Sequence, residues 1–410
     1  MPSIIKVIGV GGGGGNAVNH MYNEGIHDVT YLVCNTDNKA LSDSPVPNKL
    51  QLGKDGLGAG NRPERAKAAA LDSLDAIKES LQDGTRMVFI TAGMGGGTGT
   101  GAAPIIAQCA KDMGILTVGI VTIPFRFEGI KKIDQALSGV EELSKHVDAI
   151  LVISNERLRE IYPELTVINA FAKADNTLLV AARSIADIIT MHGIMNLDFQ
   201  DVTTVLKDGG VAVMSTGFAE GENRVTKAIE AALHSPLLNN NNIFNSQKVI
   251  ININFPQEGE DNQMKMGEMD EIHEFMGRFR KDVETKLGLA TDPTLEKQVK
   301  ITFLATGFGL NVPGMDDVIN EREKRDQEVE EDKSNLRDMY YGGGKGARKK
   351  VRIFIFSPED MDSDEVISKV GAIPTYRRTR EELNQIKKKT AAPAQAAAKP
   401  VETDTNRVEF

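Results

Sequence analysis

Two glycine-rich stretches are the parts of this chain whose residue types most directly suggest chemistry. The first reads GVGGGGGNAVNHM from Gly9, and the second reads AGMGGGTGTGAAP from Ala92. Each follows an apolar run and precedes a helical pattern. Glycine leaves backbone N–H groups bare, and N–H groups at a helix start carry partial positive charge. Two such turns can hold one polyphosphate from two sides, so the pattern predicts a phosphate-binding site.

The class of nucleotide is narrowed by the patterns that the glycines match. The Walker pattern GxxxxGK[ST] is absent, because the Gly-Lys pairs in LGKDG and GGKGA are not followed by Ser or Thr. A dinucleotide fingerprint is present at Gly9, Gly11 and Gly14, with Asp37 as a possible ribose partner. That interpretation leaves the second glycine stretch without a role. A dinucleotide-dependent oxidoreductase therefore stays an alternative.

The elements that would position these turns follow an α/β pattern through residues 1–165. Five apolar runs occur there: IIKVIGV, VTYLVCN, RMVFITAG, ILTVGIVTIPF and AILVISN. Helical patterns lie between them, at Pro63–Leu81, Ala102–Met113 and Asp134–His146. Continuously apolar strands are typical of a parallel sheet covered by helices on both faces. We therefore expect an open, Rossmann-like α/β domain with both glycine turns at its carboxyl edge.

A long helix and a second domain are expected to follow. Residues 166–193 carry apolar residues at helical steps, among them Phe171, Leu178 and Ile185. Residues 194–312 contain the apolar runs GGVAVMSTGFA, KVIININFP and QVKITFLATGFG, with helical patterns at Arg224–Leu233 and Met269–Leu287. This pattern predicts a smaller α+β domain.

The remainder of the chain has a different composition. Residues 313–363 are rich in alternating charges, as in DDVINEREKRDQEVEED, and predict a disordered linker. Residues 364–385 regain apolar content and form an island suited to docking on a partner. Residues 386–410 are expected to be disordered.

Composition and charge exclude several classes of function. The net charge of −10 argues against a general nucleic-acid binder, because such surfaces are normally basic. The two cysteines, Cys34 and Cys109, are too few for a disulfide framework and fit a reducing compartment. We find neither a secretory signal nor an apolar run long enough to span a membrane. The sequence thus predicts a cytoplasmic protein without direct membrane insertion.

The second glycine stretch identifies a family. Gly95–Gly101, GGGTGTG, resembles the signature of the tubulin and FtsZ superfamily, and the similarity to its bacterial cell-division branch extends over residues 3 to about 310. Further supporting stretches are IKVIGVGGGGGNAVNHM, CNTDNKAL, GLGAGNRPE, PFRFEG, ELSKHVDAILVISNERL, AFAKADNTLL, GIMNLDFQDV and HSPLL. The resemblance implies a GTPase domain joined by a long central helix to a smaller α+β domain, with a disordered tail.

The same resemblance implies the activity. It predicts a GTP-dependent, self-polymerising cytoskeletal GTPase that forms the bacterial division ring and hydrolyses GTP to GDP and phosphate. Magnesium is the expected counter-ion of the phosphates, with no dedicated protein metal site. A tubulin-like filament protein with another role is an alternative, which the tail island disfavours.

By this resemblance, the nucleotide contacts fall on six segments, one of which is Asn35 alone. The diphosphate, the γ-phosphate and a further phosphate clamp are assigned to three glycine loops, the ribose to Glu128 and Lys132, and the guanine to Phe171 and Asp175. The complete set implied is Gly12, Gly13, Gly14, Gly15, Asn16, Asn35, Gly58, Ala59, Gly60, Gly99, Thr100, Gly101, Glu128, Lys132, Phe171 and Asp175. Phe171 and Asp175 lie one helical turn apart and so share a face. Packing in the core is the alternative for Phe171.

The resemblance also assigns the catalytic residues, in the segment NLDFQD. Asp198 and Asp201 lie three positions apart at the start of a predicted helix, and Asn196 precedes them. In the family this loop enters the nucleotide pocket of the next subunit, where it orients the attacking water. Phosphoryl transfer needs mainly positioning and charge stabilisation, so two carboxylates and an amide suffice. The alternative for Asp198 is that it only caps the helix.

Some positions depart from the family pattern. Lys132 stands where arginine is usual, which would replace a bidentate contact with a point charge. Arg62 replaces a common asparagine, and Ser154 a frequent proline. Ile373–Arg378, IPTYRR, resembles the tail peptide that docks on membrane tethers and regulators, although the chain here continues beyond it. A charged disordered stretch is the alternative for this segment.

Overall fold

The computed structural model describes residues 3–308, except for 27, 192, 236–242, 258, 260–261 and 281, together with the isolated Ser368. The segments expected as linker, docking island and terminus, 313–363, 364–385 and 386–410, therefore lie outside the described residues apart from Ser368. Contacts divide the chain into two units, Met1–Glu328 and Val329–Phe410, and every described residue except Ser368 belongs to the first unit. In the described part of the chain, no helix combines the length and apolarity needed to cross a bilayer.

The first half of this unit is built on parallel strands. They run in the order β3-β2-β1-β4-β5-β6, and the pairs among them are parallel. Their bounds are β1 Ile5–Val10, β2 Val29–Asn35, β3 Lys49–Gln51, β4 Met87–Gly93, β5 Leu116–Ile123 and β6 Ala149–Ser154. β1 and β4 are buried along nearly their whole length, because helices cover both faces of the sheet. The predicted parallel sheet is confirmed.

Helices connect these strands, and one of them differs from the prediction. Their bounds are α1 Gly11–Glu24, α2 Asn38–Ser42, α3 Pro63–Asp72, α4 Leu74–Leu81, α5 Thr98–Asp112, η1 Arg126–Glu128, α6 Ile130–Ser144 and α7 Asn155–Ile161. The single helix predicted over Pro63–Leu81 is wrong, because the helix is interrupted at Ser73, between α3 and α4. The Ser73 hydroxyl accepts a hydrogen bond from the Gly53 N–H at 2.9 Å, which ties this break to the preceding loop.

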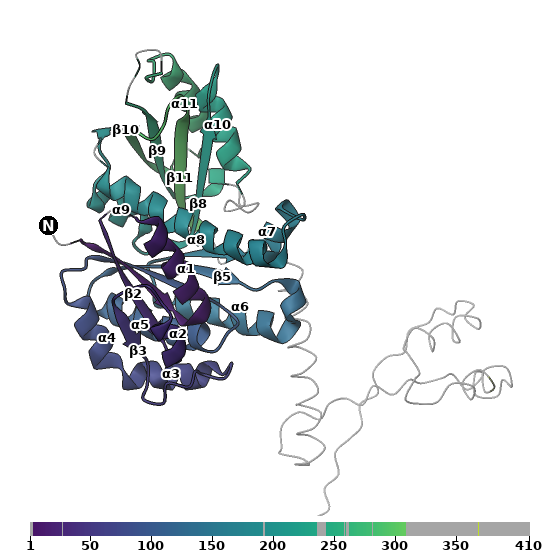
Figure 1. Cartoon of the computed structure of the whole chain (residues 1–410). Helices are drawn as coiled ribbons and strands as arrows, with labels where there is room; N and C mark the ends of the chain where they lie inside the picture. Colours follow the sequence, from purple (N-terminus) through teal and green to yellow (C-terminus); the bar gives the residue numbers. More distant parts are fainter. Residues whose placement is uncertain are drawn as a thin grey trace, which may run out of the picture. The chain divides into compact units, whose positions relative to one another are not determined.

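The predicted long helix is confirmed as α8, Val167–Thr190 (Figure 1). Thr166 caps it, because its hydroxyl accepts the Asn169 N–H at 3.3 Å. Its buried residues, including Leu178, Ala182 and Ile185, pack in one core with the first sheet and with Met214 of the following domain. α8 also lies along α1, where the Arg183 guanidinium donates to the Gly25 carbonyl at 2.9 Å. The helix therefore joins the two halves of the unit through a shared core.

The second half continues the same sheet in the order β8-β11-β9-β10-β7. Its strands are β7 Gly193–Met195, β8 Gly210–Ala219, β9 Lys248–Pro256, β10 Glu284–Asp292 and β11 Val299–Phe308, and its helices are α9 Phe199–Leu206, α10 Arg224–Leu233, η2 Ile243–Asn245 and α11 Glu268–Met276. β8 joins the first half through a short parallel pairing with β6. The helix predicted over Met269–Leu287 is wrong beyond Met276, because β10 begins at Glu284 and pairs along its length with β9.

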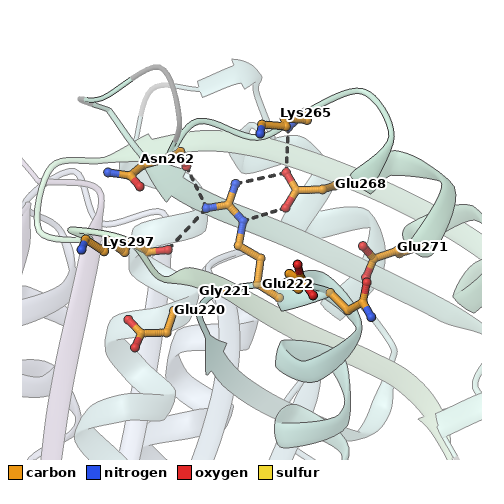
Figure 2. Close-up of a pocket in the computed structure, with 10 residues that line it drawn as sticks. Glu220, Gly221, Glu222, Asn262, Lys265, Glu268, Glu271 and Lys297 are labelled. Atoms are coloured by element: carbon orange, nitrogen blue, oxygen red, sulfur yellow. Dashed lines mark hydrogen bonds and ion pairs between the residues drawn. The ribbon is translucent and has the colours of Figure 1, made fainter.

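The loops at one end of the second half are held together by a buried arginine. Arg224, the first residue of α10, is 6% exposed. Its Nε and Nη2 donate to the Glu268 carboxylate at 2.7 and 3.1 Å. Nη2 also donates to the Gln263 carbonyl, and Nη1 donates to the carbonyls of Asn262 and Lys297. Figure 2 shows the bonds to Glu268, Asn262 and Lys297, among residues that line a pocket of about 640 Å³. Because the guanidinium is occupied in this way, we read the network as structural.

Removing this arginine should destabilise the protein. Arg224→Met would leave the Glu268 carboxylate and three carbonyls without their donor, and we expect a loss of about 3–5 kcal/mol in the free energy of unfolding. Denaturant unfolding of the full chain measures the loss. Arg280→Met is the control, since the Arg280–Asp282 pair is exposed, and its effect should stay below about 1 kcal/mol. Equal effects of the two variants would contradict the structural role of Arg224.

Candidate nucleotide site and acidic loop

Both glycine stretches lie where the strand order of the first sheet reverses. The first connects β1 to α1 and the second connects β4 to α5, and β1 and β4 are neighbours at the centre of the sheet. In open α/β sheets, ligands bind outside the carboxyl ends of the strands at this switch point. The fold therefore brings the two stretches together at the expected edge.

Most of these glycines are required by close packing of backbone against backbone. A Cβ on Gly11, whose φ is +75°, would lie 2.8 Å from the Gly99 nitrogen. A Cβ on Gly14 would lie 2.2 Å from the Thr91 carbonyl oxygen, and one on Gly101 would lie 2.0 Å from the Pro63 carbonyl oxygen. The missing side chains thus allow the starts of α1 and α5 to touch each other and their neighbours.

Other glycines present bare backbone to open space. A Cβ on Gly12 or Gly96 would meet nothing within 4 Å. Gly12, Gly13 and Asn16 are exposed at the start of α1, whereas Gly14 and Gly15 are buried. A phosphate can reach uncapped N–H groups at such a helix start. The exposed N–H groups at these helix starts therefore fit a polyphosphate. Gly96 is a candidate contact that the sequence interpretation did not single out.

The third loop, Gly58–Gly60, lies beside the second glycine stretch. Gly58 and Gly60 have φ values of +79° and +59°, and the Gly58 N–H donates to the Thr36 carbonyl at 3.0 Å. Ala59 is buried next to Gly97. A Cβ placed on Gly97 would lie 2.9 Å from the Cβ of Ala59. All three glycine loops therefore belong to one cluster at the sheet edge.

Two polar residues at the end of β2 have structural partners. The Asn35 side chain is buried and its Oδ1 accepts the Asp37 N–H at 3.2 Å. The Asp37 carboxylate caps α2, because it accepts the N–H groups of Lys39 and Ala40. A ribose-binding role for Asp37, which the dinucleotide alternative requires, would compete with this cap.

The predicted ribose residues form an ion pair next to the phosphate cluster. Lys132 Nζ lies 2.5 Å from Glu128 Oε2, and Glu128 Oε1 accepts the Phe125 N–H at 2.9 Å. Gln135, one turn further along α6, donates to the Gly95 and Gly96 carbonyls at 3.1 and 2.9 Å. The helix that carries Lys132 is therefore tied directly to the second glycine stretch.

A buried glutamate that the sequence interpretation missed holds the loop with Phe125 and Glu128. Glu156, in the first turn of α7, accepts the Arg126 N–H at 3.0 Å and two N–H groups of Arg159 at 2.8 and 2.6 Å. Burial opposes the ionisation of Glu156, but these donors outweigh it and lower its pKa. Glu156 thereby fixes the loop between β5 and α6, and no pattern along the chain connects the two segments.

The predicted guanine residues lie on α8 beside α1. Phe171 is 41% exposed and meets the Phe125 ring edge to face, with 5.1 Å between centroids. Partial burial raises the pKa of Asp175 to about 6, although His20 of α1 opposes this rise. An exposed ring and a half-buried carboxyl on one helix face provide a stacking surface and a hydrogen-bond acceptor.

The acidic loop begins α9, as predicted. Asp198 Oδ1 accepts the Asp201 N–H at 2.8 Å, and Asp201 Oδ2 accepts the Asp198 N–H at 3.2 Å, which forms a capping box. Asn196 Oδ1 accepts the Gly193 N–H at 2.6 Å. Capping is therefore present for Asp198, and it leaves the residue exposed and free to serve a second role.

The nucleotide cluster and the acidic loop lie at opposite edges of the sheet. α8 starts near Phe125, at the carboxyl edge, and its 24 residues span about 36 Å. Beyond its other end, the Phe199 ring lies 4.8 Å from the guanidinium carbon of Arg86, which directly precedes β4 at the amino edge. A single subunit therefore does not bring Asp198 and Asp201 to its own glycine loops.

The remaining departures have simple structures. Arg62 is exposed at the start of α3, and its N–H donates to the Ala59 carbonyl at 3.2 Å. Ser154 caps α7 by accepting the Arg157 N–H at 3.4 Å. Within the described residues, no three His, Cys, Asp or Glu side chains gather in a way that could hold a metal ion.

Comparison with known families matches most of the chain. Residues 4–163 match the Tubulin/FtsZ family GTPase domain, residues 210–309 the FtsZ family C-terminal domain, and residues 348–393 a further FtsZ C-terminal model. A cell division protein FtsZ from Porphyromonas gingivalis is 49% identical over 94% of this chain and 88% of its own length. Its counterpart from Azotobacter vinelandii is 46% identical over 75% of this chain and 78% of its own length.

Solved structures agree with this assignment. An empty FtsZ dimer from M. jannaschii superposes with a TM-score of 0.68 at 36% identity, covering 75% of this chain and 89% of that one. CetZ2 from Haloferax volcanii, at 18% identity and a TM-score of 0.66, shares the fold over 79% of this chain and 99% of its own. The ordered sheet, the glycine cluster at its switch point and these matches lead to one conclusion: the chain belongs to the tubulin/FtsZ family of GTPases.

Proposed function

We propose that the protein binds GTP at the three glycine loops and hydrolyses it only where a second copy supplies its acidic loop. The observation that carries this proposal is the separation of the two sites across the sheet, about the length of α8. A complete site then needs the carboxyl edge of one subunit and the amino edge of another. Subunits joined in this way form a polymer, which we assign to the division ring in line with the cell division proteins among the relatives of this chain.

The roles at the carboxyl edge follow from the chemistry of each group. Bare N–H groups of Gly12, Gly13 and Gly96 would hold phosphate oxygens at the starts of α1 and α5. The Glu128–Lys132 pair would bind the ribose. Phe171 would stack on the base, and an ionised Asp175 would accept from two N–H groups of guanine. These roles explain why an exposed ring and a carboxyl share one face of α8.

The acidic loop would complete the site in trans. Asp198 and Asp201 would orient the water that attacks the γ-phosphate, and Asn196 would hold the turn that presents them. Positioning and charge stabilisation are the main requirements of phosphoryl transfer. Magnesium bound to the phosphates would neutralise the charge that develops there.

Head-to-tail association follows from a site shared in this way. An interface between two different faces of identical subunits generates an open filament unless the rotation closes a ring. We place this filament at the mid-cell division site in the cytoplasm, by analogy with the named relatives. Ile373–Arg378, which lies outside the described residues but inside the matched segment 348–393, would dock on membrane-tethering and regulatory proteins.

Replacing Asp201 tests the catalytic assignment. We expect Asp201→Ala to bind GTP normally and to assemble into longer-lived polymers, but to lose turnover, because the carboxylate that orients water is gone. Phosphate release measures turnover, and sedimentation measures assembly. Asp282→Ala, which removes an exposed carboxylate paired only with Arg280, is the control and should hydrolyse GTP normally. Normal turnover by Asp201→Ala would show that the assignment is incorrect.

Dependence on protein concentration tests the shared site. Because one subunit lacks a complete site, we expect specific activity to nearly vanish below a threshold concentration and to rise above it with polymer mass. Phosphate release and light scattering over a dilution series locate the threshold. Full specific activity in a dilute, monomeric sample would rule out hydrolysis in trans.

Acidity should weaken nucleotide binding through Asp175. Its pKa is about 6 in the free protein, and only the ionised form accepts from both N–H groups of guanine. Binding is therefore unaffected well above pH 6 and weakens as the pH falls, by about tenfold between pH 7 and pH 5, since the competent fraction shrinks. Titration of fluorescent GDP measures this change.

Asp175→Asn is the matched control for this titration. The amide of the variant does not titrate, while the nucleotide phosphates titrate with both proteins. The variant should bind GDP more weakly and lose most of the pH dependence. An identical pH dependence in both proteins would exclude Asp175 as the titrating contact.

A further inference from the structure

The acidic loop has a basic partner on the neighbouring strand. Lys286 of β10 places its Nζ 3.0 Å from Asp201 Oδ1. The other carboxylate oxygen, Oδ2, accepts the Asp198 N–H. Each oxygen of Asp201 is therefore held by a different donor, and this fixes the orientation of the carboxylate within the capping box.

β10 supports the acidic loop through its middle residues, from Lys286 to Ala290. Its backbone pairs with β7, with Leu289 opposite Met195 and Ala290 opposite Gly193. A Cβ on Gly288 would lie 2.5 Å from a methyl carbon of Leu197, so the loop packs directly on the strand there. Lys286 lies two residues before Gly288 and thus on the same face of β10. The strand places a cation under the start of α9.

Charge explains why such a cation matters. Bringing Asp198 and Asp201 to a triphosphate places like charges close together, which opposes association. Lys286 reduces the net charge of this group from −2 to −1. Glu284 is the other charged residue whose field reaches Lys286. Burial opposes the ionisation of Asp201, but the hydrogen bonds from Lys286 and the Asp198 N–H outweigh it and lower its pKa.

We propose that Lys286 is a positioning residue for hydrolysis, which holds Asp201 in its working orientation and enters the neighbouring subunit's phosphate site as the counter-ion of the acidic loop. This inference rests on the proposed function, because it assumes that Asp201 acts in trans. Lys286 is 37% exposed and Asp201 26%, so solvent screens the pair in part. We therefore expect its loss to lower turnover by about three- to tenfold and not to abolish it.

A series of substitutions graded by charge tests this proposal. Lys286→Met keeps the apolar stem and removes the charge, Lys286→Glu reverses it, and Lys286→Arg restores it. We expect kcat per sedimented subunit to follow the order wild type, Arg, Met, Glu, while KM for GTP and the unfolding temperature stay unchanged. Lys297→Met, an exposed change of equal charge at the turn between β10 and β11, should hydrolyse GTP at the wild-type rate.

The outcomes separate this inference from the proposed function. Turnover of Lys286→Met equal to that of wild type would overturn the role of Lys286, whereas inactive Asp201→Ala would still support hydrolysis in trans. A loss of turnover in Lys286→Met that only matches its loss of polymer sedimented with a non-hydrolysable GTP analogue would also overturn the positioning role, because the ion pair would then serve only the subunit contact. Equal losses in Lys286→Met and Lys297→Met would reduce the effect to net charge.

Discussion

The close approach of two helix starts is the constraint on which the nucleotide site depends. α1 and α5 leave adjacent strands, and their first turns come within contact distance because Gly11 and Gly99 carry no side chains. Each glycine costs conformational entropy on folding. The gain is that backbone N–H groups from two helix starts lie side by side. Gly14 and Gly101 allow the same close packing of backbone further along the two helices. The glycine-rich pattern therefore reports architecture as much as binding.

The long helix α8 sets the second constraint. It carries the proposed guanine contacts, Phe171 and Asp175, near one end and leads into the acidic loop at the other, and its buried face packs in a core that both halves share. A rigid connection of this kind fixes the distance between a subunit's nucleotide site and its own acidic loop. Under the proposed function, this geometry makes assembly part of the catalytic requirement and not a separate property.

Periodicity and glycine patterns were enough to predict the parallel sheet, α8 and the cluster of glycine loops, because these features depend on residues close together in the chain. The helix break at Ser73 was missed, since it depends on a hydrogen bond from Gly53. Residues 284–287 of β10 were predicted as the end of a helix and the rest of the strand was not predicted, because its sequence, ETKLGLATD, lacks the continuous apolar run of a central strand. The roles of Glu156 and Lys286 were also missed, because their partners, the Arg126 N–H and Asp201, belong to other elements of the fold. For Asp198, the resemblance implied catalysis and the residue type left helix capping as the alternative; the fold shows the cap, and the catalytic role stays a proposal.

The placement of the two sites on opposite edges also gives any filament a direction. One end presents a nucleotide pocket open to solvent, and the other presents an acidic loop with nothing to act on. Under the proposed function, a filament contains one fewer complete site than it has subunits, and the subunit with the open pocket would keep its GTP intact. Growth and loss at the two ends are therefore chemically different events, a polarity already encoded in the direction of a single helix.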